Sequence, residues 1–292
     1  MADTPSVSES KFRPARVEAR DAERTVPSPQ TQSKSYKLAF QDNEFLLRDD
    51  LRPVRFQLEL MKPELMLDEA KISSTFVFYG SARIPEPDAA QARIDAARTD
   101  YERKVAERLQ VSSKYYEEAR RLARISAQFP VNEEGCRNFV VCSGGGPSIM
   151  EAANRGAADV GATTIGLNIV LPHEQAPNAY VTPELSFQFH YFALRKMHFT
   201  LRARALAVFP GGFGTFDEFF ELLTLVQTGK MKPIPILVFG KDFWARVINF
   251  EALAEEGVIS PRDLDLISWV ETAEEAWAVV EAFYADTDAP GC

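Results

Sequence analysis

Residues 210–218 read PGGFGTFDE, a glycine-rich turn that ends in the carboxylate of Glu218. The turn follows an apolar run at 205–209 and precedes helical periodicity at 219–226, so we expect it to join a strand to a helix. Glycines let the backbone approach a ligand closely, and the free N–H groups of a helix start favour an anion. The segment therefore predicts a phosphate-binding turn with an acidic side chain nearby.

The same residues also have a purely structural interpretation. Thr215 as N-cap and Glu218 three residues later form the pattern of a capping box, in which each side chain bonds to the other residue's backbone N–H. A capping box does not account for the glycines at 211, 212 and 214, since glycine destabilises a chain where close approach or an unusual φ is not needed. We favour the anion-binding interpretation, with which the capping geometry can coexist.

Two further glycine-bearing turns follow predicted strands. Gly80-Ser81 ends the apolar run 75–79, and Gly144-Gly145-Gly146 follows the run 139–142. The triple glycine matches neither the dinucleotide fingerprint nor the P-loop, so a nest of N–H groups for phosphate and a merely tight turn remain equally open. In a parallel sheet, all three turns would lie on one edge, at the carboxyl ends of the strands.

Arg195 and Lys196 lie in a predicted helix over 188–203. A basic pair on a helix is usually a solvated face, yet aromatic residues surround this one, and a half-buried guanidinium needs an anionic partner. Both interpretations stay open. The three histidines, at 173, 190 and 198, lack metal-binding spacing, and Cys142 is expected to be a small core residue.

Apolar runs alternate with helical patterns along residues 73–286, which predicts an α/β fold with a parallel sheet covered on both faces. We expect strands at 75–79, 139–142, 163–169, 205–209, 234–239 and 266–270, and helices within 87–129 and at 188–203, 219–226, 242–256 and 272–285. The fold class is a Rossmann-like, doubly wound parallel sheet with an N-terminal helical extension. Ligands in such folds bind beyond the carboxyl ends of the strands.

Outside this domain we expect three smaller parts. Residues 1–35 are rich in Ser, Pro, Thr, Gln, Glu and Arg and are predicted to be a disordered tail. Residues 36–72 suggest two short helices, broken near Pro53 and Pro63. Residues 287–292 form a C-terminal tail.

Composition excludes several function classes. The 292 residues carry a formal net charge of −9, which argues against non-specific binding to nucleic acid or to anionic membranes. Three cysteines without a CxxC pair fit a reducing compartment, and the N-terminus lacks the apolar segment of a signal peptide. The expectation is a soluble cytoplasmic protein that contains no metal and binds neither membrane nor nucleic acid.

The motifs taken together resemble the Lonely Guy family, the cytokinin-activating phosphoribohydrolases often labelled lysine decarboxylases. The family signature is an Arg-Lys pair followed about a dozen residues later by PGGxGTxxE, which matches Arg195-Lys196 and residues 210–218. Segments 80–83, 144–151, 171–175 and 224–230 resemble its longer bacterial branch. The resemblance covers roughly residues 75–284. One departure is Ser148, where that branch usually has glycine; its hydroxyl would donate to phosphate or alter the start of the following helix.

The resemblance implies hydrolysis of the N-glycosidic bond of AMP or N6-modified AMP to the free base and ribose 5-phosphate. It implies no cofactor, and at least a homodimer or a higher homo-oligomer. Glu218 is implied as the catalytic carboxylate under the ribose, and Arg195 as its partner that keeps it ionised and orients the substrate. The implied substrate-binding residues are Ser81, Gly144, Gly145, Gly146, Met150, Glu174, Lys196, Gly211, Gly212, Gly214, Thr215, Asp217 and Thr224.

Two alternatives accompany this hypothesis. Relatives with this fold bind molybdenum cofactor without hydrolysis, so a non-catalytic nucleotide or molybdenum-cofactor carrier is the second candidate. The Arg195 and Glu218 pair argues against a carrier, which does not need it. A lysine decarboxylase, the third, lacks a recognisable pyridoxal phosphate context in this sequence. The acid that protonates the leaving base and the preference for plain or prenylated adenine are left open.

Overall fold

The structure is a computed structural model of the chain and describes residues 13–172 and 176–285. The chain divides into two compact units, residues 1–59 and 60–292. The predicted domain boundary at residue 72 differs from this division. The C-terminal tail predicted at 287–292 and residue Glu174 lie outside the described residues.

The first unit contains short helices joined by turns. A tail without secondary structure was expected up to residue 35, but α1 (Ala15–Ala22) lies within it, because the run ARVEARDA is rich in residues that favour helix. The elements that follow are η1 (Lys34–Tyr36), η2 (Ala39–Gln41), α2 (Asn43–Leu46) and η3 (Asp49–Leu51). The side chain of Asp42 caps α2 by accepting from two backbone N–H groups.

Helix α3 (Arg52–Glu69) continues through Pro63, so the predicted break there is wrong. A proline removes one N–H donor from a helix, but tertiary packing can outweigh that loss. Pro63 and Leu67 are buried, and the carboxylate of Glu64 accepts from Arg202 at 2.8 Å. These contacts fix the C-terminal part of α3 within the second unit.

The second unit is built on a seven-stranded sheet in the order β4-β3-β2-β1-β5-β6-β7. Every pair of neighbouring strands is parallel, which confirms the predicted sheet. The strands are β1 (Thr75–Tyr79), β2 (Val140–Ser143), β3 (Thr164–Ile169), β4 (Ser186–Phe189), β5 (Ala203–Val208), β6 (Ile236–Phe239) and β7 (Ser268–Val270).

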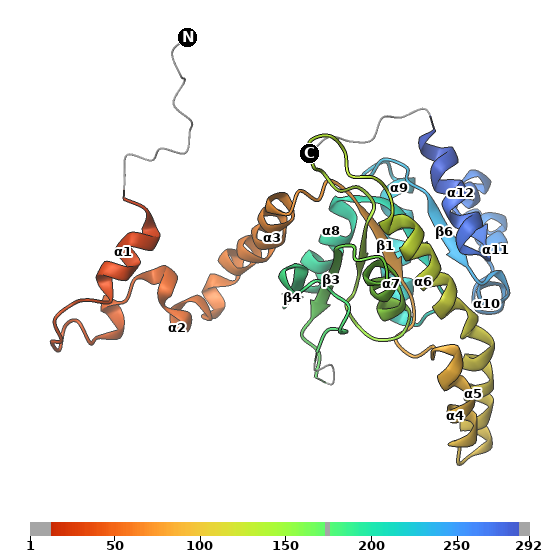
Figure 1. Cartoon of the computed structure of the whole chain (residues 1–292), viewed down its shortest axis with the longest axis horizontal. Helices are drawn as coiled ribbons and strands as arrows, with labels where there is room; N and C mark the ends of the chain where they lie inside the picture. Colours follow the sequence, from red (N-terminus) through yellow and green to blue (C-terminus); the bar gives the residue numbers. More distant parts are fainter. Residues whose placement is uncertain (1–12, 173–175, 286–292) are drawn as a thin grey trace, which may run out of the picture. The chain divides into compact units, whose positions relative to one another are not determined.

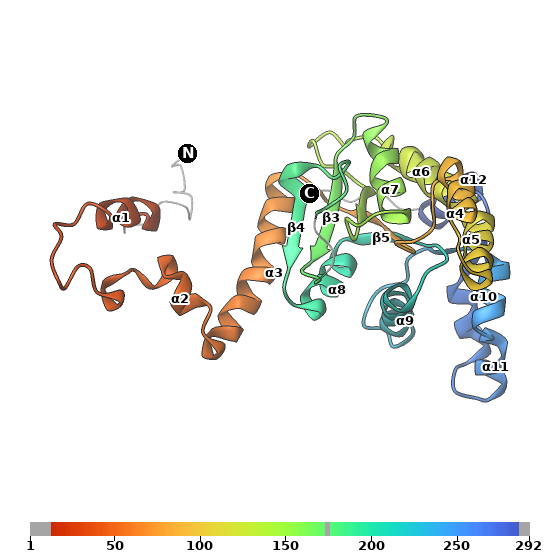
Figure 2. The same cartoon turned by 90° about the horizontal axis from the view of Figure 1, so that it is seen from below.

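Helices cover both faces of the sheet, as expected for a doubly wound fold (Figures 1 and 2). After α3, the helices of the second unit are α4 (Pro87–Asp95), α5 (Asp100–Ser112), α6 (Lys114–Ala127), α7 (Ile149–Ala158), α8 (Phe192–Leu201), α9 (Phe213–Gln227), α10 (Lys241–Val247), α11 (Phe250–Glu255) and α12 (Ala273–Tyr284). Short η4 (Pro183–Leu185) and η5 (Pro261–Leu266) turns complete the unit. No helix in the described part of the chain is long and apolar enough to cross a membrane.

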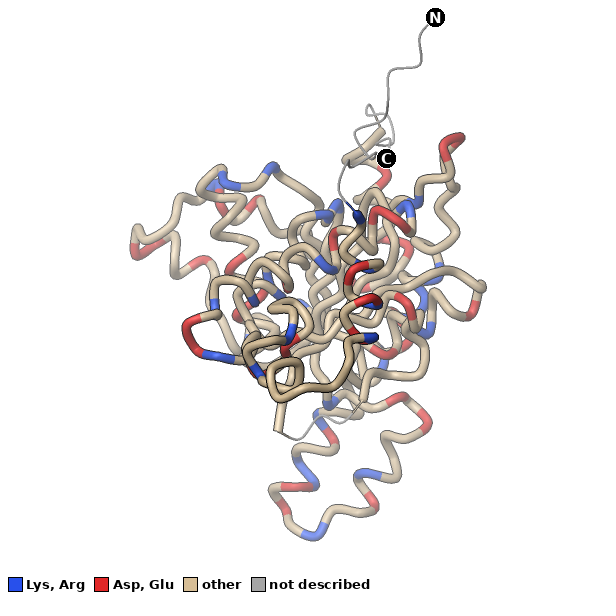
Figure 3. Tube along the Cα trace, turned by 90° about the vertical axis from the view of Figure 1, so that its left-hand side faces the viewer, with Lys and Arg blue, Asp and Glu red and all other residues tan. Residues whose placement is uncertain are grey.

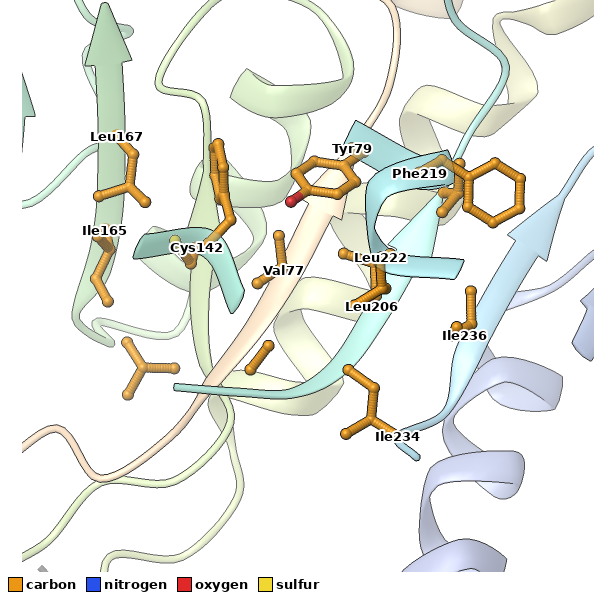
Figure 4. Packing of buried hydrophobic residues seen from close by; sticks show 14 of the residues in the cluster. Val77, Tyr79, Cys142, Ile165, Leu167, Leu206, Phe219, Leu222, Ile234 and Ile236 are labelled. Carbon is orange, nitrogen blue, oxygen red and sulfur yellow. The ribbon is translucent and has the colours of Figure 1, made fainter. Parts of the chain in front are cut away.

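Alternate strand residues divide the core into two clusters, one on each face. Val77, Leu206 and Ile236 face the helices α8 to α11, and Figure 4 shows them beside Phe219 and Leu222 of α9. The residues directly before and after them in each strand point to the opposite face, where they pack against α6, α7 and α12. Because both faces of each central strand are buried, the strands read as continuous apolar runs.

Three predicted elements of this unit differ from the structure. The helix expected at 242–256 forms two helices, α10 and α11. Strand β4, with the sequence SFQF, occupies the beginning of the helix expected at 188–203, because its alternating Phe187 and Phe189 pack against the sheet. The long segment 87–129 forms three helices, where one or two were expected.

The strand order reverses direction at β1, which is flanked by β2 and β5. The turn after β1 meets the turn after β5 where the Ser81 N–H donates to the Pro210 carbonyl at 3.1 Å. It meets the beginning of α7 where the Ile149 N–H donates to the Ser81 carbonyl at 3.3 Å. The three glycine-bearing turns therefore lie at the edge where ligands bind in such folds.

Candidate functional site

Helix α9 begins earlier than a capping box requires. Its N-cap is Gly212, without a side-chain cap, and Thr215 lies inside the helix, buried against Gly211. The carboxylate of Glu218 turns toward Arg195 of α8. The capping-box interpretation of Thr215 and Glu218 is therefore wrong, and the first N–H groups of α9 have no side-chain cap.

Arg195 and Glu218 form a largely buried ion pair. The Nη1 atom of Arg195 lies 3.0 Å from Oε1 of Glu218, and the two side chains are 11% and 13% exposed. The Nε of Arg195 donates to the carbonyl of Leu167 in β3 at 2.7 Å, and its guanidinium lies 5.0 Å from the ring centre of Phe199. Contacts from a strand and two helices thus fix the guanidinium in one position.

Burial raises the pKa of Glu218 to about 7, although Arg195 acts to lower it. We expected Arg195 to keep this carboxyl ionised, whereas desolvation of the carboxylate outweighs the attraction of its partner. The Glu218 carboxyl therefore titrates much closer to neutral pH than an exposed glutamate does. A carboxyl with this pKa can carry or accept a proton at physiological pH, as catalytic carboxyls do.

The raised pKa predicts a pH-dependent effect of Glu218→Gln on stability. The folded state holds the proton more tightly than the unfolded state, so wild-type protein loses stability from this group as pH rises from about 4.5 to about 7. Glutamine does not titrate. The unfolding free energy of the variant relative to wild type should therefore rise by up to about 3 kcal/mol over that interval. Urea unfolding at pH 5 and pH 8 measures it, and a pH-independent difference would contradict the raised pKa.

Gly144, at the end of β2, lies directly against the guanidinium. A Cβ atom on Gly144 would lie 2.6 Å from Nη2 of Arg195 and 2.8 Å from the sulfur of Met150. Both separations are too short for non-bonded atoms, so a side chain here would displace the arginine. The absence of a side chain at Gly144 therefore leaves room for both Arg195 and Met150.

The rest of the triple glycine bonds to the protein itself. The Gly145 N–H donates to Ser143 Oγ at 3.1 Å, and Asn178 donates to the carbonyls of Gly145 and Gly146. The N–H of Gly145 is thus occupied, which favours the tight-turn interpretation for this residue. Polar residues that the sequence analysis missed support the turn: Ser143, Asn154 and Asn178 form a hydrogen-bonded network, and the side chain of Asn168 lies against Gly145. Asn168 interrupts the apolar strand β3, a signal that was visible in the sequence.

Lys196 lies beside the pair but bonds to other carboxylates. Its Nζ lies 3.1 Å from Asp217 and 3.0 Å from Glu221, both in α9. Burial opposes charging of Lys196, yet the two carboxylates raise its pKa above the ordinary value. The arginine and the lysine together join α8 to α9 by three ion-pair contacts.

The structure does not bring every predicted residue to this place. Thr224 lies six residues beyond Glu218, about 9 Å along α9, and its hydroxyl donates to the Phe220 carbonyl. The hydroxyl of Ser81 accepts from the Arg83 N–H at 2.9 Å, so it bonds within its own turn.

Ser148 is buried and has φ 67°, a conformation that glycine adopts more readily. Its hydroxyl donates to the Ile84 carbonyl. This bond holds the beginning of α7 to the turn after β1, and the hydroxyl is not directed to a phosphate. The bond offers a physical reason why serine is tolerated where the family branch usually has glycine.

The other chemistry-bearing residues are structural. Burial raises the pKa of the Cys142 thiol far above the ordinary value, as expected for a core cysteine. His198 is buried, with Nδ1 3.5 Å from Glu64. Within residues 13–172 and 176–285, no group of three His, Cys, Asp or Glu side chains has the arrangement of a metal site.

The chain is similar in sequence to one protein family and to plant phosphoribohydrolases. A family model described as "Possible lysine decarboxylase" matches residues 150–280, which include Arg195 and the 210–218 turn. Cytokinin riboside 5'-monophosphate phosphoribohydrolase LOG3 of Arabidopsis thaliana is 27% identical over 156 residues, 52% of this chain and 71% of the relative. LOG4 of the same plant is 26% identical over the same shares of the two chains.

Solved structures with a similar fold include two described as binding or carrying molybdenum cofactor. The protein from Rippkaea orientalis is 17% identical with a TM-score of 0.43, covering 72% of this chain and 97% of that one. The carrier from Chlamydomonas reinhardtii is 18% identical with a TM-score of 0.41, covering 73% and 99%. Over about half of its length the chain is therefore similar to these phosphoribohydrolases, and its Arg-Lys pair and its PGGFGTFDE turn lie within the residues that the family model matches.

Proposed function

We propose that this protein hydrolyses the N-glycosidic bond of a purine nucleoside 5'-monophosphate, AMP or an N6-modified AMP, to the free base and ribose 5-phosphate. The observation that carries the proposal is the buried Arg195–Glu218 pair, fixed next to the uncapped beginning of α9. The curated relatives are named for this reaction on cytokinin riboside 5'-monophosphates, which supports the proposal.

In the proposed complex the phosphate lies at the start of α9. The N–H groups there and the positive end of the helix dipole attract an anion. Gly212 and Gly214 are exposed, and a Cβ atom at either would meet no atom within 4 Å. The space beside both glycines is thus open to a ligand.

Glu218 follows Gly214 by four residues, about 6 Å along the helix axis, so a sugar attached to that phosphate can extend toward the carboxylate. Glycosidic cleavage passes through an oxocarbenium-like state, which a nearby carboxylate stabilises. In the proposed mechanism, ionised Glu218 stabilises the positive charge that develops at the anomeric carbon. Arg195 holds the carboxylate in place through the contact at 3.0 Å, and water completes the hydrolysis.

The family description names lysine decarboxylation, but the lysine at this place does not fit that chemistry. A lysine that forms a Schiff base reacts as the neutral amine. Lys196 lies between two carboxylates that raise its pKa and stabilise the ammonium form. The site therefore supports glycosidic hydrolysis better than amine chemistry.

Two alanine substitutions separate the binding of phosphate from folding. Gly214→Ala adds a methyl group in open space within the first turn of α9, so the melting temperature should hold or rise, because alanine favours helix over glycine by about 1 kcal/mol. The same methyl group lies where the phosphate is expected, so KM for AMP should rise by about tenfold or more. Gly211→Ala is the contrast: its Cβ would overlap Thr215, which should lower the melting temperature by several degrees. An unchanged KM in Gly214→Ala would place the phosphate elsewhere.

The proposed function is tested by incubating the purified protein with AMP, GMP, CMP and isopentenyl-AMP and separating the products by chromatography. Release of free base with an equal amount of ribose 5-phosphate from a purine nucleotide is the expected result. Tight nucleotide binding without release of base from any of the four would overturn the enzyme and favour a carrier. The ratio of rates for AMP and isopentenyl-AMP then decides the preferred base.

A further inference from the structure

The charges around the proposed phosphate position do not balance a phosphate monoester. Basic and acidic residues are interspersed along the trace (Figure 3). At the site, Arg195 and Lys196 already have carboxylate partners. Arg195 is paired with Glu218, and Lys196 is shared by Asp217 and Glu221. A helix N-terminus contributes only about half an elementary charge, whereas a phosphate monoester carries about −1.5 to −2. A further cation near this position would therefore strengthen the binding of the nucleotide.

Arg83 is an exposed arginine in the turn after β1, two residues beyond Ser81. Among residues 13–172 and 176–285, no carboxylate lies within ion-pair distance of its guanidinium. Arg195 and Lys196 each have a carboxylate partner, whereas the charge of Arg83 is not neutralised by a carboxylate in the described part of the protein.

The backbone of Arg83 is held in place on both sides. Its N–H donates to Ser81 Oγ at 2.9 Å, and its carbonyl accepts from Arg93 Nη1 of α4 at 2.7 Å. The side chain therefore extends from a fixed point.

That point is close to the beginning of α9. The Ser81 N–H donates to the carbonyl of Pro210 at 3.1 Å, and Gly211 follows Pro210 directly. The two turns meet at Ser81. Because two residues of chain span at most about 7 Å, the backbone of Arg83 lies within about 7 Å of this meeting point. An arginine side chain extends far enough from its backbone to reach across such a turn.

We infer that Arg83 binds the 5'-phosphate of the substrate and makes the enzyme select nucleoside monophosphates over nucleosides. The inference rests on the proposed function and adds a residue to it. A guanidinium donates two parallel hydrogen bonds to a phosphate, which a lysine ammonium does not reproduce. Arg93 acts as a positioning residue, because its guanidinium holds the carbonyl of Arg83.

The experiment compares Arg83→Gln, Arg83→Lys and wild type with AMP and with adenosine as substrates. Arg83→Gln should raise KM for AMP by on the order of 10- to 100-fold, leave kcat within a few-fold, and leave the rate with adenosine and the calorimetric affinity for adenosine as they are in wild type. Arg83→Lys should lie between the two, since it keeps the charge but loses the second hydrogen bond. Arg103→Gln, which removes an exposed cation from α5, should behave as wild type.

The inference is overturned if Arg83→Gln keeps the wild-type KM for AMP, or if it impairs adenosine as much as AMP. Because Arg83 is exposed, the melting temperature of Arg83→Gln should equal that of wild type. This measurement serves as the control for an intact fold. If wild-type protein releases no base, the proposed function fails, and calorimetric binding of AMP and adenosine then tests Arg83 alone. In that case, loss of AMP affinity in Arg83→Gln with adenosine affinity unchanged still supports the inference, and equal AMP affinity contradicts it.

Discussion

Glu218→Gln is expected to lower kcat for AMP hydrolysis by about 10³-fold while leaving nucleotide affinity within a few-fold of wild type. The substitution keeps the volume and the hydrogen-bonding oxygen that faces Arg195 but removes the negative charge. The charge matters most when the sugar becomes oxocarbenium-like, so the loss falls on the transition state and spares the ground state. Single-turnover kinetics and calorimetric nucleotide binding measure the two effects separately.

A matched control is Glu271→Gln. Glu271 follows β7 and is likewise a carboxylate held by a cation, with Lys114 Nζ at 3.3 Å and Tyr115 Oη at 3.0 Å. It lies at the far side of the sheet, beyond β6, so its loss should affect stability and not kcat. Near-wild-type kcat in Glu218→Gln, or an equal loss in both variants, would remove Glu218 from the mechanism.

The pH dependence of kcat/KM shows whether activity needs the ionised or the protonated form of Glu218. Burial raises the pKa of Glu218 to about 7, so the ionised fraction of the free protein increases through neutral pH. If the carboxylate is the active form, kcat/KM rises with pH up to about 7 and then levels off. A fall with pH over the same range would show that Glu218 works as the acid.

Arg195→Lys is the second substitution with a large expected effect, a loss of kcat/KM on the order of 10²-fold. One guanidinium holds both the Leu167 carbonyl at 2.7 Å and the Glu218 carboxylate at 3.0 Å, and its central carbon lies over the ring of Phe199. An ammonium keeps the charge but cannot occupy both positions in the same plane. Glu218 would then move by a fraction of an ångström or more, which is costly for a catalytic group.

Arg202→Lys controls for the general cost of altering a buried arginine. Arg202 is 13% exposed at its side chain and bonds to Glu64 and Asp68 of α3, away from the glycine turns. Its variant should melt at a lower temperature with an unchanged kcat per folded molecule. If Arg195→Lys loses stability alone and keeps its kcat, the pair is structural.

The local elements of the second unit were predictable because their signals are local. Strands such as Thr75–Tyr79 and Ala203–Val208 are short apolar runs ended by glycine or proline turns, and the structure has strands there. Their alternation with helices was sufficient for the parallel sheet, since parallel neighbours require a crossover. The boundaries were less accurate: α3 continues through Pro63 and β4 replaces the beginning of a predicted helix, because packing against the sheet outweighs propensity at both places.

The sequence also placed the glycine turn and Glu218 within one segment, but it left the role of Thr215 ambiguous. Capping and anion binding require the same residue types at the same spacing, so only coordinates separate them. In the structure α9 begins at Phe213, which leaves Thr215 inside the helix and frees Glu218 to face α8. The asparagines behind the triple glycine were missed because they come from β3, α7 and the loop before η4 and meet only in the folded chain.

The amino-acid sequence by itself determined the fold class, the edge of the sheet where the glycine turns gather, and the family signature. All three depend on residue type and spacing along the chain, which folding does not change. Only the tertiary structure decided which charged side chains have a partner of opposite charge and in which direction the pKa of Glu218 is shifted. Those properties depend on desolvation and on partners from other elements: Arg195 reaches Glu218 from a different helix, while Arg83 finds no described carboxylate. Charge and pKa are set by distances in space, and no spacing along the chain reports them.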